Sequence, residues 1–312
     1  MTHTQFVHYM PKKWMKGDIS HSPFSAEMNA LTLALADSTF EPKKFKDLYI
    51  AIHKELEENT GVVFVNNSAL KNFNAKEKKK IFFQLCQFIG KPVSINKTGE
   101  LIREVKDSGL KDSIDKPVRG HLTDQSLAFH SDRADITAML CDTISESGGA
   151  FKICSSSNLF DALKAYPQAL EILMQDIPHD LRDEGAGGAQ ICYHPIISNQ
   201  KSFVVRYIRK FVDSIVRHGM VVDHKITDAL NTVDFILNSD GFFEEIYFKP
   251  NDMIFFNNHI TLHARNAFVD SNKNKRCLFR IWLSSEFSRE LPNSFQSLFY
   301  STKAGTHRGG VM

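Results

Sequence analysis

The sequence predicts a mixed α/β fold, in which a double-sheet jelly roll is surrounded by helices. Two observations carry this prediction. Short apolar strand patterns separated by turn residues recur along the chain, and helical patterns gather mostly before them and in one insert. The 312 residues are 42% hydrophobic and 24% charged, which is typical of a globular protein with a sizeable core. We expect a single domain over residues 1–312, with an N-terminal extension to about residue 44 and a C-terminal tail from about residue 285.

The N-terminal part carries three helical patterns and one strand. Residues 25–35 are compatible with a helix. Pro42 opens an amphipathic helix, because proline suits a first helical turn and apolar residues follow at helical spacing, at Phe45, Leu48, Ile52 and Leu56. A strand over 61–65 comes next. Asn74 begins the third helix, since Asn74 and Glu77 approximate a capping box.

The middle of the chain alternates strands and turns. Residues 93–124 have mixed charge and little periodicity, which fits either a lid over a site or a surface connection. Strand patterns over 136–141 and 151–154 flank a turn at 147–149, and a helix follows over 159–175. The remaining patterns predict a strand over 201–211, a helix over 227–238 and further strands over 244–248, 253–257 and 275–283.

Composition excludes several classes of function. The net charge of +2 gives no argument for a nucleic-acid or membrane-surface partner. No stretch approaches the roughly 20 apolar residues of a membrane helix, and the first residues contain no signal peptide. The five cysteines are scattered and form no CxxC, which fits reduced thiols in the cytoplasm. We expect a cytoplasmic protein with a small-molecule partner, and both a monomer and a homo-oligomer remain open.

One short stretch places an imidazole and a carboxylate two residues apart. His130 and Asp132 follow the apolar residues Leu127 and Phe129. On an extended strand such residues point to the same face, so both can reach one metal ion. Taken alone, the pair also fits a surface pair or a hydrogen-bonded core pair. His263 is the best candidate for a third ligand. Two histidines and one carboxylate form the facial triad of non-haem Fe(II) oxygenases, which leaves three positions for co-substrate and O2.

Several further motifs surround these residues, namely 129–132 with 135–141, 147–149, 251–258, 263–265 and 276–283. In this order and spacing the chain resembles the taurine dioxygenase / 2,4-dichlorophenoxyacetate dioxygenase (TauD/TfdA) superfamily of Fe(II)- and 2-oxoglutarate-dependent oxygenases, over roughly residues 45–285. The resemblance implies a double-stranded β-helix of the clavaminate synthase-like type. It also implies iron ligands at His130, Asp132 and His263, with Fe(II), 2-oxoglutarate and O2 taking part in catalysis.

The resemblance also implies an arginine that binds the far carboxylate of 2-oxoglutarate. Arg276 lies 13 residues after His263, where the family puts this arginine, and a guanidinium binds a carboxylate in a bidentate fork. Arg280, four residues later, shares its face and is a candidate for a substrate group or for the clamp itself. Family members often carry a serine or threonine where this chain has Phe151, so Ser155 or another hydroxyl substitutes, or the arginine acts alone.

We therefore expect a dioxygenase that hydroxylates an unactivated C–H bond of a small, anionic or amino-acid-like substrate and releases succinate and CO2. Asp132 argues against halogenation, since halogenating relatives have alanine or glycine there, while desaturation remains open. The substrate-side candidates are Arg280, Ser126, Phe129, Ser131 and Arg133. Two alternatives are a non-catalytic binding protein on the same barrel and a zinc-type metalloenzyme on a cupin-like barrel.

Overall fold

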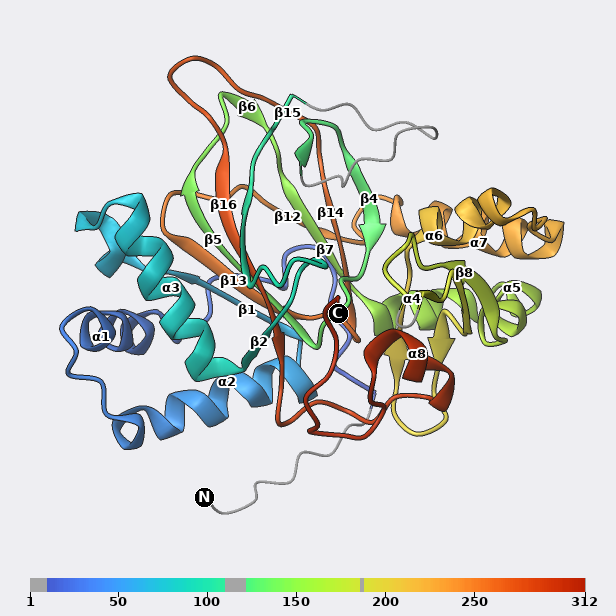
Figure 1. Ribbon diagram of the computed structural model, residues 1–312, viewed down its shortest axis with the longest axis horizontal. Coiled ribbons are helices and arrows are strands. Elements are labelled where there is room, and N and C mark those ends of the chain that lie inside the picture. Colours follow the sequence, from blue (N-terminus) through green and yellow to red (C-terminus); the bar gives the residue numbers. More distant parts are fainter. Residues whose placement is uncertain (1–9, 110–121, 186–187, 312) are drawn as a thin grey trace.

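Two antiparallel sheets form the centre of the molecule, with helices on both outer sides (Figure 1). The computed structural model describes residues 10–109, 122–185 and 188–311. The larger sheet has the order β1-β13-β5-β16-β2, with β3 also paired to β16, and the smaller has the order β12-β7-β14-β4. The strands of the larger sheet are β1 (Val62–Asn66), β13 (Asp252–Asn257), β5 (Ile136–Thr143), β16 (Cys277–Ser284), β2 (Lys91–Val93) and β3 (Ile102–Val105). Those of the smaller sheet are β12 (Glu244–Ile246), β7 (Phe151–Ser155), β14 (Thr261–Arg265) and β4 (Leu127–His130).

The inner faces of the two sheets share one apolar cluster. The larger sheet contributes Phe64, Met139 and Phe256, and the smaller sheet contributes Phe151 and Ile246. Because side chains alternate along a strand, the neighbours of these residues point outward to the helices. The mixed α/β class with antiparallel sheets is therefore confirmed.

Three helices cover the outer face of the larger sheet (Figure 1). They are α1 (Ser25–Ala36), α2 (Lys46–Glu58), which follows a 3-10 turn at Pro42–Phe45, and α3 (Ala75–Ile89). The capping box predicted at Asn74 and Glu77 is present, and all three predicted helices are confirmed. A short 3-10 helix, Ser68–Asn72, lies between β1 and α3.

The outer face of the smaller sheet packs against α4 (Ser156–Leu163), α5 (Pro167–Leu173) and α7 (His224–Leu237). The single helix predicted over 159–175 is wrong, because Pro167 has no N–H for an interior helical bond and begins α5 instead. The strand predicted over 201–211 is also wrong in its extent, since β11 covers only Val204–Val205, Ile208 forms an isolated β-bridge, and α6 (Arg209–Asp213) follows. Short pairs complete this side: β6 (Ser147–Gly148) with β15 (Phe268–Val269), β8 (Ile177–Asp180) with β9 (Ile191–His194), and β10 (Ile197–Ser198) with β11.

The predicted lid over 93–124 is only partly described, because residues 110–121 lie outside the described ranges. Its first part contains β3, which pairs with β16 from Ile102 to Val105. The expectation of an irregular segment is wrong for these four residues. The strand was missed because it is short and its burial does not alternate.

The end of the chain packs tightly although it has little regular structure. Beyond β16 it contains a 3-10 turn at Asn293–Phe295 and the short helix α8 (Gln296–Phe299). Arg308 is 1% exposed, and its Nε donates to Asp135 Oδ1 at 2.8 Å. The backbone N–H of Gly310 donates to the carbonyl of Arg133 at 2.7 Å. The final residues therefore brace the turn that follows β4.

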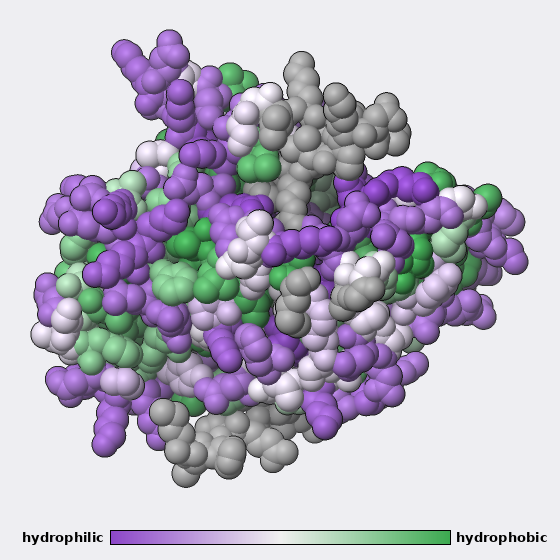
Figure 2. Space-filling model, viewed as in Figure 1, coloured by the Kyte–Doolittle hydropathy of each residue, from purple (hydrophilic) through white to green (hydrophobic). Residues whose placement is uncertain are grey.

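None of the described helices has both the length and the hydropathy that a membrane crossing requires. Hydrophilic side chains cover most of the face seen in Figure 2, and apolar side chains show between them in smaller areas.

Candidate active site

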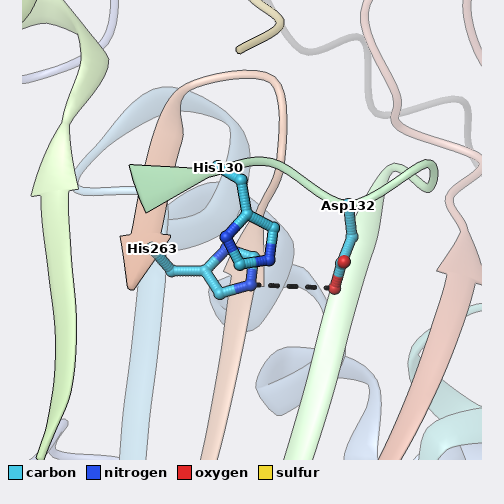
Figure 3. A group of neighbouring side chains, drawn as sticks. All are labelled: His130, Asp132 and His263. Atoms are coloured by element: carbon cyan, nitrogen blue, oxygen red, sulfur yellow. Dashed lines mark ion pairs between the residues drawn. The ribbon is translucent and has the colours of Figure 1, made fainter. Parts of the chain in front are cut away.

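The structure brings the three predicted metal ligands together (Figure 3). His130 ends β4, and His263 lies directly opposite it on β14. Asp132 lies two residues beyond β4. One ligand atom from each side chain lies within 4.8 Å of the others, and this is the only such group among the residues in the described ranges. His263 Nε2 is 3.8 Å from Asp132 Oδ2, and the two imidazole centroids are 4.2 Å apart. This spacing fits three ligands of one metal ion.

Strand alternation explains why both imidazoles point between the sheets. The neighbours of His263, Leu262 and Ala264, pack outward in the cluster shared with the helices. Phe129 does the same beside His130, and its ring contacts Phe243 at 5.6 Å. The ligands therefore occupy the inner face that the sequence pattern required.

Hydrogen bonds orient two of the ligands. Nδ1 of His130 lies 2.8 Å from the carbonyl of Ala128, which leaves Nε2 for a metal. Asp132 Oδ2 accepts from Thr137 Oγ1 and from Trp282 Nε1, both at 2.9 Å. These donors hold the carboxylate in one orientation, as expected for a metal ligand.

Burial and neighbouring charges favour the ligand forms of these groups. Burial lowers the pKa of His130 and of His263, so both imidazoles are neutral at physiological pH. Burial alone would raise the pKa of Asp132, but the charge of the Arg280 guanidinium and the hydrogen bond from Trp282 oppose it, and the pKa lies below its ordinary value. Neutral imidazoles and an ionised carboxylate are the forms that bind a metal.

Arg276 lies where a co-substrate carboxylate would need it. It directly precedes β16, is 4% exposed, and its Nη1 has no hydrogen-bond partner among the described residues. The guanidinium packs over the Phe268 ring at 5.2 Å. A Cβ at Gly149 would lie 3.3 Å from Arg276 Nε, so glycine permits this close approach. A buried cation with a nitrogen that lacks a partner in the described structure fits the far carboxylate of 2-oxoglutarate.

A second arginine shares the Phe268 ring. Arg265 packs over it at 4.9 Å, and its Nη2 donates to the carbonyl of Thr123 at 2.8 Å. Its Nε and Nη1 have no hydrogen-bond partner in the described structure. Burial lowers the pKa of Arg265 and of Arg276 to about 10, so both remain charged at neutral pH. The sequence interpretation assigned no role to Arg265, although it lies two residues from His263 and shares its face.

A cavity of about 490 Å³ opens beside the metal ligands. Its wall includes His130, Asp132, Arg280 and Trp282. Arg280 Nη1 lies 3.7 Å from Asp132 Oδ2. The charged lining is mainly basic, with Arg133, Arg182, Arg206, Arg209, Lys210, Arg217 and Arg280 against Asp132, Asp183 and Glu184. Such a lining favours an anionic ligand.

The other predicted substrate residues differ in what their side chains do. Ser126 is exposed at the cavity. Ser131 is fully buried, and its Oγ accepts from Arg206. Arg133 donates to the carbonyl of Glu184 and to the hydroxyl of Tyr300, so its guanidinium joins chain segments. Phe129 borders the cavity, but its ring packs outward as described above.

Ser155 lies at the opposite end of β7 from Phe151. In the register with β14, Phe151 faces Arg265 and Ser155 faces Thr261. Four residues of strand span about 13 Å, so the structure does not bring Ser155 beside Arg276. Its hydroxyl is buried without a partner in the described structure. The Phe151 ring instead stacks on the His263 ring, with 5.8 Å between the two ring centroids.

Several residues around the triad were missed from sequence. Trp282 follows Arg280 by two positions on β16, so alternation could have placed it on the same face. Asn258 accepts from the backbone N–H of Asp132 at 3.0 Å and donates to Thr137 Oγ1 at 3.0 Å. Arg206 comes near the metal ligands only through the tertiary fold, and no local sequence pattern indicates that it does so.

Comparison with known proteins agrees with this geometry. A family model described as taurine catabolism dioxygenase TauD, TfdA family matches residues 27–282. FR-33289 synthase from Streptomyces rubellomurinus (strain ATCC 31215) is 26% identical over 260 residues, which cover 80% of this chain and 77% of that protein.

Solved structures share the fold at low sequence identity. An asparagine oxygenase in complex with Fe(II), 2S,3S-3-hydroxyasparagine and succinate has a TM-score of 0.63 and 13% identity, over 88% of this chain and 93% of that one. The non-haem iron oxygenase OrfP in complex with Fe and alpha-ketoglutaric acid has a TM-score of 0.58 and 14% identity, over 85% and 93%. With the family model spanning most of its length, the chain belongs to the TauD/TfdA family and is a 2-oxoglutarate-dependent dioxygenase.

Proposed function

We propose that this dioxygenase hydroxylates an unactivated C–H bond of a small, anionic or amino-acid-like substrate, with release of succinate and CO2. The observation that carries the proposal is the close group of His130, Asp132 and His263, and the buried Arg276, whose Nη1 has no partner in the described structure, supports it. The two packed sheets support a double-stranded β-helix, and the buried chain end supports one domain over residues 1–312.

Each residue of the site has a separate task. His130, Asp132 and His263 would hold Fe(II) on one face, and Arg276 would bind the far carboxylate of 2-oxoglutarate. When bound, these two groups supply the activation of O2 and the oxidation of the C–H bond. Thr137 hydrogen-bonds the Asp132 carboxylate and keeps it oriented. The chain thus provides the geometry of the site.

The cavity supports an acidic substrate. Arg280 reaches the metal-ligand region, and basic side chains outnumber acidic ones around the wall. We propose Arg280 and Ser126 as substrate-binding residues and Arg276 as the main 2-oxoglutarate clamp. The structural relatives bound to hydroxyasparagine and to (3S)-hydroxy-L-Arg support an amino-acid-like substrate, and the name FR-33289 synthase describes a biosynthetic relative.

The role of Asp132 supports hydroxylation over halogenation, because its carboxylate occupies the ligand position that a halide would need. The five cysteines are free thiols, and four of them are buried, which supports a cytoplasmic protein without disulfides. We further propose that nucleic acid and membrane are not partners, and a homo-oligomer remains compatible with the chain.

A coupled assay tests the proposal. Purified protein with Fe(II), 2-oxoglutarate and O2 is screened against small acids and amino acids for substrate-dependent release of succinate. We expect succinate release that stops without O2 and in the His130→Ala variant. A protein purified with bound zinc, with no O2 dependence, would favour the zinc-type alternative, and failure to bind 2-oxoglutarate would favour the non-catalytic one.

A further inference from the structure

Arg206 lies on a segment that runs beside the first metal-ligand strand. The segment follows β11, and Ile208 forms a β-bridge with His130. The backbone N–H of Ser131 donates to the carbonyl of Tyr207 at 3.0 Å. Arg206 therefore sits next to the residue that separates His130 from Asp132, and it borders the cavity described above.

The guanidinium of Arg206 is buried without an acidic partner. The side chain belongs to a residue that is 4% exposed. Its Nη1 donates to the carbonyl and to Oγ of Ser131, the latter at 3.2 Å, and its Cζ lies 5.9 Å from the Phe299 ring centroid. No carboxylate among the described residues forms an ion pair with it. These contacts engage one of its three nitrogens and neutralise none of its charge.

Two other arginines of the same cavity provide the contrast. Arg209 pairs with Asp213 at 3.2 Å and with Asp234 at 2.9 Å. Arg217 pairs with Asp180 and with Asp183, both at 3.2 Å. The charges of Arg209 and Arg217 are therefore already paired with carboxylates of the chain.

The described side chains around Arg206 offer no substitute for a carboxylate. His179 and His194 line the adjoining small cavity, and burial lowers the pKa of both, so they are neutral. Burial also lowers the pKa of Arg206, to about 10, so its guanidinium stays charged at neutral pH. Asp132 is the acidic group that favours this charge, but it is committed to the metal site. A buried, unpaired charge is costly, so an anion from outside the chain would relieve it.

We infer that Arg206 binds an acidic group of the substrate, a carboxylate or another oxyanion, in the cavity beside the metal ligands. This inference rests on the proposed function and deepens it. Arg206 and Arg280 both line the cavity, where Arg280 lies 3.7 Å from Asp132 and Arg206 contacts the neighbouring Ser131. They thus give the cavity two cationic positions. The substrate class that fits best carries an acidic group at a fixed distance from the C–H bond that is oxidised.

Sulfate is the probe for the test. The full chain is loaded anaerobically with Fe(II) and saturating 2-oxoglutarate, and sulfate is titrated against chloride at constant ionic strength. Binding is followed by calorimetry and by the change in the visible band of the loaded complex. We expect saturable binding by the native chain, about 10- to 100-fold weaker in Arg206→Gln, because hydrogen bonds to a charged group are lost. Arg206→Lys should be intermediate. The control Lys201→Gln removes a cation that pairs with Glu290 outside this cavity, and it should bind sulfate as the native chain does.

Each outcome decides one question. Equal sulfate affinity in Arg206→Gln, or no saturable binding by the native chain with a normal visible band, overturns the inference alone. No visible band in the native chain contradicts the proposed function itself. If Arg206→Gln loses the band, Arg206→Lys replaces it in the comparison. Loss of the band in that variant too would make Arg206 a residue that positions Ser131, which also overturns the inference.

Discussion

Replacement of Arg276 by glutamine is expected to weaken 2-oxoglutarate binding without weakening the metal-free fold. The residue is 4% exposed, and Nη1 has no hydrogen-bond partner in the described part of the chain. Its cation packs over Phe268, and Gly149 leaves room for it. Because no described carboxylate forms an ion pair with this guanidinium, its removal costs the fold little, whereas a bound carboxylate loses its counter-charge.

The expected loss of 2-oxoglutarate affinity follows from the two hydrogen bonds that a guanidinium can donate to one carboxylate. A hydrogen bond to a charged group contributes about 1.5–3 kcal/mol, so losing two costs at least about 3 kcal/mol, or roughly a hundredfold in the Kd for 2-oxoglutarate. The free energy of unfolding of the metal-free protein should change by less than about 1 kcal/mol, because no ion pair within the described ranges is broken.

Both quantities can be measured on the same preparations. The Kd is obtained by anaerobic titration of the Fe(II)-loaded protein with 2-oxoglutarate, and stability by urea unfolding of the metal-free protein. Arg276→Lys keeps the charge without the fork and should bind with intermediate affinity. The matched control Lys152→Gln removes a cation that pairs with Glu245 at 3.6 Å and should leave the Kd unchanged. A Kd for Arg276→Gln within threefold of the native value would refute the reasoning.

Three further predictions concern groups around the site. Trp282→Phe removes the donor to Asp132, so iron affinity in a chelator competition should fall about 10- to 100-fold. Burial would raise the pKa of Asp135, but the ion pair with Arg308 outweighs burial and lowers the pKa to about 2. Its stabilising effect is therefore complete above pH about 4 and is lost as the pH falls through about 2, which amounts to about 2 kcal/mol in urea unfolding. Arg133→Met should cost about 2–4 kcal/mol of stability, because its donors to Tyr300 and to carbonyls are lost, with little change in substrate KM.

Each of these has a result that would contradict it. Unchanged iron affinity in Trp282→Phe would mean that the indole does not orient the carboxylate. For Asp135, the Asp135→Asn variant should lose less stability than the native chain between pH 4 and pH 2, and an equal loss would remove Asp135 as the cause. A large rise in KM with normal stability in Arg133→Met would return Arg133 to the substrate site.

The nearness of His130 and Asp132 was predictable because they are two residues apart in the sequence. The strand rule holds only up to His130, where β4 ends, and Asp132 lies beyond the strand, where Thr137 and Trp282 orient its carboxylate. His263 lies on β14, so its place opposite His130 depends on strand pairing and not on local spacing. Strand alternation also predicts that Phe129 points away from the face of His130. Its packing against Phe243 agrees with this direction. Phe129 also borders the cavity, so its predicted contact with the substrate stays a prediction.

Other parts of the site depend on contacts that no local pattern encodes. Arg206 reaches the metal strand through a β-bridge to a distant segment. The chain end lacks periodicity, yet it is buried because Arg308 pairs with Asp135 across 173 positions of sequence. Proline chemistry, by contrast, was available in the sequence, and Pro167 could have divided the helix predicted over 159–175.

The central claim is that one iron ion and 2-oxoglutarate share the site built on His130, Asp132 and His263. The most direct test adds Fe(II) and then 2-oxoglutarate to the metal-free protein under anaerobic conditions and records the visible spectrum. We predict a weak charge-transfer band that requires both additions and is absent in His263→Ala. No band, together with no calorimetric binding of 2-oxoglutarate, would contradict the account.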